Sequence, residues 1–141
     1  MIKSKIKKIL VALDGSKNSY RGLDMGIYLA RQCDTKLTGI YVISNIPKKE
    51  YDMDYPEKPL LIAAEDILET AKIRCARNGV LFEKKIDFGD PGSKITAFAK
   101  ALDFDIIVIG VRGISNIKEV LLGSVSNHVL HKSTIPVMII R

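Results

Sequence analysis

Glycine and serine residues gather in two short runs near the C-terminus, at a spacing that suits the binding of a phosphate group. Gly110-Val111-Arg112-Gly113 is followed, nine residues later, by Gly123-Ser124-Val125-Ser126. Glycines allow the backbone to approach a ligand because they have no Cβ atom. A helix that begins at Gly123-Ser124 would offer free N–H groups and the positive end of its dipole to a phosphate. Ser124 and Ser126 add hydroxyl groups, and Arg112 adds a charged donor.

Two better-known nucleotide signatures are absent from this region. No Gly-Lys-Ser/Thr ends the loop, and no Gly-x-Gly-x-x-Gly follows a predicted strand. Two glycines by themselves would be explained by turns. The apolar run before them and the helical pattern after them favour a loop that contacts a ligand.

Asp14 is a second candidate for chemistry, because it follows directly on the first apolar run of the chain. A carboxylate at the carboxyl end of a strand can hold a ribose hydroxyl or a divalent ion such as Mg²⁺ or Mn²⁺. The alternative is that Asp14 and Gly15 only form a turn. Efficient phosphoryl transfer also needs a cation on the phosphates and a residue that orients the nucleophile. No complete set is evident, so we assign no catalytic residue and keep Asp14 as a candidate metal ligand.

His128 and His131 are three positions apart in a helical pattern, which could place both on one metal ion. No third ligand is evident. Asn127 and Lys132 beside them favour a solvated helix face instead.

The composition indicates one globular domain over residues 1–141. Hydrophobic residues make up 47% and charged residues 27% of the chain, which excludes disorder. The 22 basic residues exceed the 16 acidic ones by 6, so the surface should attract anions. Aromatic residues are only 6% of the chain and tryptophan is absent, so few side chains could stack on bases, which argues against nucleic acid as a partner.

The cysteines and the first apolar run bear on the cellular location. Cys33 and Cys75 show no metal-binding spacing, which favours reduced thiols and a cytoplasmic protein. The apolar run Ile9–Leu13 is too short for a signal peptide or a membrane span. We therefore expect no membrane association.

Strand and helix patterns alternate along the whole chain. Strands are expected at Lys7–Leu13, Lys36–Ile43, Val80–Asp87, Asp105–Ile109 and Ile135–Ile140. The charges in Val80–Asp87 are typical of a sheet edge. A loop over Ser44–Pro59 is long enough to be a binding segment. The alternation implies a parallel sheet with helices on both faces, whose ligands bind beyond the carboxyl ends of the strands.

The first three predicted helices show apolar residues at steps of three and four. Ser16 and Asp90 can cap the first and third helices, and Asn78-Gly79 should end the second. Gly22 and Gly26 are expected where the first helix approaches the sheet closely. The apolar faces of the first, second and third helices are, in turn, Tyr20, Leu23, Ile27 and Ala30; Leu61, Ala64, Leu68, Ala71 and Cys75; and Ile95, Phe98, Ala99 and Leu102. A fourth helix is expected over about Ser124–Lys132.

The spacing G-x2-G-x9-G-[S/T], formed by Gly110, Gly113, Gly123 and Ser124, resembles the nucleotide-binding motif of the universal stress protein family. The resemblance runs from KILVALDGS at Lys8 through FGDP at Phe88 and DIIVIG at Asp105 to LGSVSNHVL and IPVM, and so covers essentially the whole chain. It implies an α/β fold: an open, doubly wound, five-stranded parallel sheet of order 3-2-1-4-5. Such an order places a crevice between the first and fourth strands.

The resemblance also implies ATP as the ligand, because members that carry these glycines bind it. By this likeness Ala12, Leu13 and Asp14 would line the ribose and adenine side, and the backbone of Val42 would meet adenine. Many relatives have serine or threonine where Val111 stands, so we expect altered phosphate contacts. The residues expected at the phosphates are Gly110, Arg112, Gly113, Gly123, Ser124, Val125 and Ser126.

Three functions remain open at this point. The first is an ATP-binding stress-response or signalling switch, in which the bound state changes the 44–59 loop or a partner surface. The second is a slow, metal-assisted ATPase or phosphotransferase. The third is a dimeric interaction module without a nucleotide. A homodimer through the apolar run Ile135–Ile140 suits all three, because relatives commonly dimerise there and Pro136 fits an edge strand.

Overall fold

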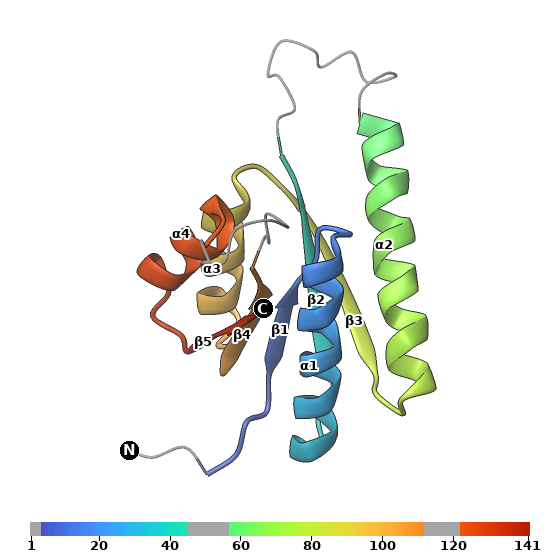
Figure 1. Ribbon diagram of the computed structural model, residues 1–141, viewed down its shortest axis with the longest axis vertical. Helices are drawn as coiled ribbons and strands as arrows, with labels where there is room; N and C mark the ends of the chain where they lie inside the picture. Colours follow the sequence, from blue (N-terminus) through green and yellow to red (C-terminus); the bar gives the residue numbers. More distant parts are fainter. Residues whose placement is uncertain (1–3, 45–56, 112–121) are drawn as a thin grey trace.

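Five strands and four helices alternate in the computed structural model, which describes residues 4–44, 57–111 and 122–141 (Figure 1). The predicted alternation of strands and helices is confirmed. The elements are β1 (Ile9–Ala12), α1 (Lys17–Cys33), β2 (Leu37–Ile43), α2 (Glu57–Arg77), β3 (Phe82–Phe88), α3 (Pro91–Ala101), β4 (Ile106–Gly110), α4 (Ser124–Lys132) and β5 (Val137–Ile140). The strand bounds differ from the predicted ones by at most two residues.

The strands form one parallel sheet in the order β3-β2-β1-β4-β5, as predicted. β1 lies at its centre, where Val11 pairs with Gly39 of β2 on one side and with Val108 of β4 on the other. The chain therefore adds β2 and β3 on one side of β1 and then crosses over to add β4 and β5 on the other side. This reversal puts the topological switch point at the carboxyl ends of β1 and β4, where open sheets of this kind bind ligands.

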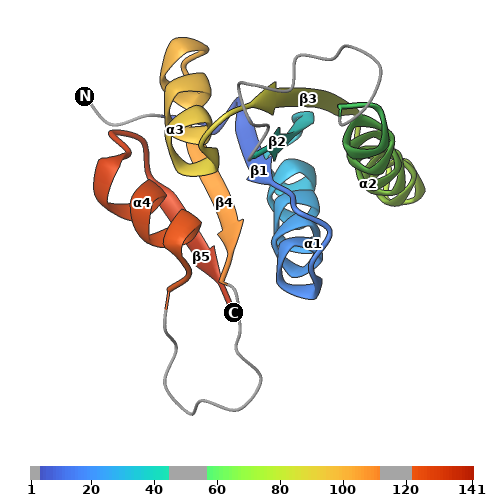
Figure 2. The same cartoon turned by 90° about the horizontal axis from the view of Figure 1, so that it is seen from above.

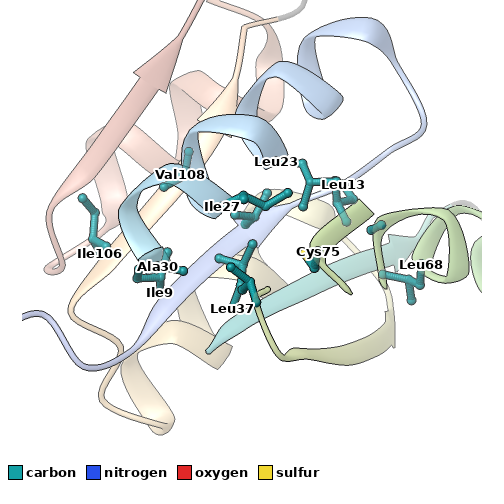
Figure 3. Packing of buried hydrophobic residues seen from close by; sticks show 13 residues of the cluster. Ile9, Leu13, Leu23, Ile27, Ala30, Leu37, Leu68, Cys75, Ile106 and Val108 are labelled. Atoms are coloured by element: carbon teal, nitrogen blue, oxygen red, sulfur yellow. The ribbon is translucent and has the colours of Figure 1, made fainter. Parts of the chain in front are cut away.

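The helices cover both faces of the sheet, with α1 and α2 on one side and α3 and α4 on the other (Figure 2). Because side chains alternate along a strand, β1 supplies both layers. Ile9, Val11 and Leu13 pack under α1 and α2 (Figure 3), whereas Leu10 and Ala12 pack under α3 and α4. All of these side chains are buried, which explains why β1 reads as a continuous apolar run.

Side-chain caps begin two of the helices as predicted. The Ser16 hydroxyl accepts a hydrogen bond from the Ser19 N–H at 3.1 Å, and an Asp90 carboxylate oxygen accepts one from the Ser93 N–H at 2.9 Å. α2 ends at Arg77, before Gly79, whose φ of 73° suits a glycine. The local sequence therefore sets where these helices begin and end.

The predicted close approach of α1 to the sheet is confirmed. A Cβ atom at Gly26 would lie 2.6 Å from Cγ2 of Val11, and one at Gly22 would lie 3.4 Å from the backbone nitrogen of Gly110. Larger residues at Gly26 would force α1 away from β1.

Several residues near helix ends were placed wrongly from the sequence. Positions 57–59 belong to the first turn of α2 and not to the preceding loop. Pro59 is possible there because the first N–H groups of a helix have no partner within it. Leu61 is 38% exposed, since the first turn of α2 extends beyond the ends of the strands (Figure 1). Leu102 is 45% exposed because α3 ends at Ala101 and the chain turns there. Positions 45–56 of the predicted loop lie outside the described residues.

Within the described ranges, no helix is both long and apolar enough to cross a membrane.

Candidate functional site

A cleft of about 160 Å³ opens at the carboxyl edge of the sheet, at the switch point between β1 and β4. The ends of three neighbouring strands and the first turns of α3 and α4 surround it. Its lining residues are Ala12, Leu13, Asp14, Ser19, Ile40, Tyr41, Val42, Ser44, Pro91, Ile95, Ile109, Gly110, Gly123, Val125 and Ser126.

Most of the residues predicted from the sequence to contact a ligand lie together in this cleft. They are Ala12, Leu13, Asp14, Val42, Gly110, Gly123, Val125 and Ser126. Ser124 lies next to them as the first residue of α4, exposed and outside the lining. Arg112 and Gly113 lie outside the described residues.

Sequence reasoning missed several residues of the cleft. Ile40 and Tyr41 come from β2, Pro91 and Ile95 come from α3, and Ser19 comes from α1. Ser44 directly follows β2, and Ile109 is the last residue but one of β4, at the same edge. The strand ends could have been found from the rule that parallel strands present their carboxyl ends at one edge. The α3 residues could not, because nothing local shows which helix covers β2.

The start of α4 differs from the other helix starts at this edge. α1 and α3 have side-chain caps, whereas Gly123 begins α4 without a side-chain cap hydrogen bond. The first helical bond of α4 runs from the Asn127 N–H to the Gly123 carbonyl at 2.9 Å. The preceding N–H groups of α4 have no partner within the helix, and the helix dipole makes this end positive. The positive end of the α4 dipole therefore lies at Gly123, in the lining of the cleft.

Ser126 is 3% exposed, and its hydroxyl donates to the Gly123 carbonyl at 3.1 Å. The proton of this hydroxyl thus points at the backbone. The Ser126 oxygen can still accept a hydrogen bond from a ligand.

Asp14 is exposed at the rim of the cleft, and its Oδ1 accepts a hydrogen bond from the Ser16 N–H at 2.9 Å. This is an Asx turn, in which the side chain bonds the backbone two residues ahead. Gly15 completes the turn with a φ of 82°. The turn holds the carboxylate of Asp14 at the end of β1, so the turn and ligand interpretations of Asp14 are compatible.

Gly110 has a structural reason to be glycine that the sequence did not show. A Cβ atom there would overlap the backbone carbonyl of Asn18 in the first turn of α1. The missing side chain therefore allows α1 to pack on β4, in addition to leaving Gly110 in the wall of the cleft. The next residue, Val111, is only 3% exposed and is no part of the cleft lining.

The sequence predicted that His128 lies on a solvated helix face, and this prediction is wrong. His128 is half-buried between α3 and α4, where a Cβ atom at Gly92 would lie 2.6 Å from the Cγ of its ring, whereas His131 is exposed. Asp90 lies at the start of α3, and the Ser93 N–H lowers the pKa of its carboxyl below the usual value. In the described part of the chain, no group of three or more His, Cys, Asp or Glu side chains could hold a metal ion.

The fold and the cleft define a doubly wound α/β protein with a cleft at its switch point and a helix start without a side-chain cap hydrogen bond on one wall. The model of the universal stress protein family matches residues 5–141. The chain belongs to the universal stress protein family.

Individual relatives agree with this assignment. The chain is 36% identical to the universal stress protein YxiE of Bacillus subtilis over 147 residues, which covers 95% of this chain and 98% of the relative. Its fold is similar to that of the universal stress protein UspA from Lactobacillus plantarum, with a TM-score of 0.83, 24% identity, and coverage of 99% and 100% of the two chains. It is also similar to the universal stress protein from Archaeoglobus fulgidus in complex with dAMP, with a TM-score of 0.76, 25% identity, and coverage of 96% and 98%.

Proposed function

We propose that this protein binds an adenine nucleotide, with ATP as the preferred ligand, in the cleft between β1 and β4. We propose further that it acts as a nucleotide-dependent stress-response switch. The observation that carries the proposal is the start of α4. This helix begins at Gly123, which lines the cleft and makes no side-chain cap hydrogen bond. An anion at this point would accept the hydrogen bonds that a capping side chain otherwise accepts.

The two ends of the cleft suit the two ends of a nucleotide. On the β2 side, Ile40, Val42 and Ile95 form an apolar wall that suits a base. On the β4 side, Gly110 and Gly123 leave backbone open to a phosphate. β1 lies between β2 and β4, so the two sides are roughly 10 Å apart at the usual strand spacing. The base therefore belongs at the β2 end and the phosphates at the start of α4.

The same arrangement gives the remaining site residues their proposed roles. Asp14, at the end of the central strand, lies between the two ends and is the proposed partner of the ribose hydroxyls. A Mg²⁺ or Mn²⁺ ion would have the Asp14 carboxylate as a protein ligand and would take phosphate oxygens of the nucleotide as others. We assign Arg112, Gly113 and Ser124 to the phosphates with Gly123, Val125 and Ser126.

The Archaeoglobus fulgidus relative supports this assignment, because it forms a complex with dAMP. That ligand has an adenine base and one phosphate, which are the two groups that the ends of this cleft suit. ATP carries two further phosphates and more negative charge for the same helix start. No observation on the described residues favours hydrolysis over binding, so we propose binding as the primary activity.

The switching role requires a surface that a partner can read. β5 is at the edge of the described sheet, and its residues Val137–Ile140 are half-buried. An apolar edge strand offers unpaired backbone groups to a second chain. We therefore retain a homodimer through β5 as part of the proposed function, in a cytoplasmic protein.

The start of α4 offers a direct test, because stability and affinity should change in opposite directions. Gly123 has a φ of −67° and a ψ of 167°, which any residue adopts, so Gly123→Asp fits the backbone. The new carboxylate would cap α4 and take the place of the phosphate. We expect Gly123→Asp to be at least as stable as the unmodified protein but to bind ATP at least about tenfold more weakly in calorimetry.

Adenosine and a neutral variant are the controls. Adenosine affinity should change by less than about twofold in Gly123→Asp, since adenosine has no phosphate. Gly123→Asn caps the helix without a charge and should lie between the two proteins in ATP affinity. Undiminished ATP binding by Gly123→Asp, or no binding of ATP and dAMP by the unmodified protein, would refute the proposal.

A further inference from the structure

Asn18, in the first turn of α1, connects this helix to the end of β4. Its Nδ2 group donates a hydrogen bond to the carbonyl of Val111, although the two residues are 93 positions apart in the sequence. Its own backbone carbonyl lies against Gly110, at the point where a Cβ atom would overlap it. One residue of α1 thus contacts two successive residues at the end of β4.

The second polar group of Val111 is also held. The Val111 N–H donates to the Ile140 carbonyl at 2.8 Å, so this residue is bonded to β5 on one side and to α1 on the other. The Val111 side chain is buried. Three features therefore fix Val111 at the end of β4: the hydrogen bond to Ile140, the burial of its own side chain, and the hydrogen bond from the Asn18 amide. Only the last of these depends on a side chain of α1.

We propose that Asn18 is a positioning residue for the phosphate end of the cleft. It acts through Val111, because its amide fixes the backbone beside Gly110, which lines the cleft on the β4 side. Asn18 itself is no part of the lining and needs no contact with the ligand. The inference rests on the proposed nucleotide binding and adds a residue that the glycine spacing does not include.

The location of the contact predicts which part of a nucleotide depends on it. Asn18 meets the chain at Gly110 and Val111, on the side of β1 opposite to Ile40 and Val42. Loss of the amide should therefore disturb phosphate binding at the β4 side and leave the base-binding side on β2 unchanged.

The test uses Asn18→Leu, which keeps the branched shape of the side chain and removes the donor. We expect ATP affinity to fall by roughly fivefold to tenfold, the effect of losing about one hydrogen bond, while adenosine affinity changes by less than about twofold. The N–H of Val111 should exchange with deuterium faster than in the unmodified protein without ligand, because its carbonyl is no longer held. Asn18→Ala should show the same pattern and replaces Asn18→Leu if the latter does not fold.

Asn78 provides a matched control. Its Nδ2 donates to the Arg74 carbonyl at 2.8 Å at the end of α2, away from the cleft, so Asn78→Leu removes the same kind of bond elsewhere. We expect Asn78→Leu to leave both affinities and the exchange of Val111 unchanged.

The possible results separate the two proposals. If the unmodified protein binds ATP and Asn18→Leu binds it within twofold, the positioning role is overturned and the proposed function stands. An equal loss of ATP and adenosine affinity would also overturn the positioning role, since it indicates general damage. If the unmodified protein binds neither ATP nor dAMP, both proposals fail together.

Discussion

Gly110 and Gly22 face each other where α1 packs on β4, and the structure predicts opposite effects when each becomes alanine. A Cβ atom at Gly22 would lie 3.4 Å from the Gly110 nitrogen, an ordinary contact distance, whereas one at Gly110 would overlap the Asn18 carbonyl. The same methyl group is thus tolerated on the helix and excluded on the strand. A substitution at Gly110 would therefore disturb the packing of α1 on β4, and through it the cleft, even if Gly110 made no contact with a ligand.

The magnitudes follow from the atoms that would have to move. In Gly110→Ala the obstacle is the backbone of α1, which cannot relax by rotating a side chain, so the cost should lie near the upper end of the usual overpacking range, at about 3 kcal/mol. Displacement of α1 would also weaken the Asn18 to Val111 hydrogen bond, by about 1 kcal/mol. In Gly22→Ala the helix propensity of alanine should stabilise the protein by up to about 1 kcal/mol.

Urea denaturation followed by far-UV circular dichroism, without nucleotide, would measure both free energies of unfolding. Gly110→Ala should lose about 3 to 4 kcal/mol, and Gly22→Ala should be as stable as the unmodified protein or slightly more stable. The reasoning is refuted if Gly110→Ala loses less than about 1 kcal/mol, or if Gly22→Ala is the more destabilised variant.

Three further predictions concern caps and thiols. Ser16→Ala removes the cap of α1 and should lower the free energy of unfolding by about 1 kcal/mol in urea denaturation; no change would mean that the cap is redundant. Because the Ser93 N–H lowers the pKa of Asp90 in the folded state, this group stabilises the protein above its unfolded pKa, and the stabilisation is lost as the pH falls through the folded pKa. Asp90→Asn keeps the cap without a titrating group, so its stability should depend less on pH below about pH 4, and an acid unfolding profile identical to that of the unmodified protein would contradict this. Burial raises the pKa of the Cys75 thiol to about 11, so a disulfide reagent at pH 8 should label only the half-buried Cys33 in the native protein and both thiols after unfolding; rapid native labelling of Cys75 would show that α2 opens readily.

The residues that begin and end the helices could be identified from the sequence because the signals are local. Ser16, Asp90 and Gly123 each lie directly before the helix that they begin, within one turn of the groups that they affect. The predicted range of α4, Ser124–Lys132, agrees with the structure at both ends. Leu61 and Leu102 were misplaced because helical periodicity does not show where the layer beneath a helix ends.

The strand order was implied by the family resemblance and not by the residues, since a local pattern does not show which strands pair. Once β1 lies between β2 and β4, the strand ends that carry Asp14, Val42 and Gly110 meet at one edge, and the candidate site follows. Eight of the fifteen lining residues were therefore predicted from the sequence and the resemblance. Both missed the wall from α3, because Ile95 belongs to a helix whose apolar face looks like any other.

The amino-acid sequence by itself determined the elements of this protein, their caps and the alternation that makes the sheet parallel, because those properties depend on neighbours a few residues apart. The tertiary structure decided the contacts between distant segments. It showed that a side chain at Gly110 would overlap the backbone of α1, and that Asn18 donates a hydrogen bond to Val111, 93 positions away in the sequence. Such contacts depend on how α1 crosses β4, and this geometry cannot be predicted from the residue pattern of either segment alone.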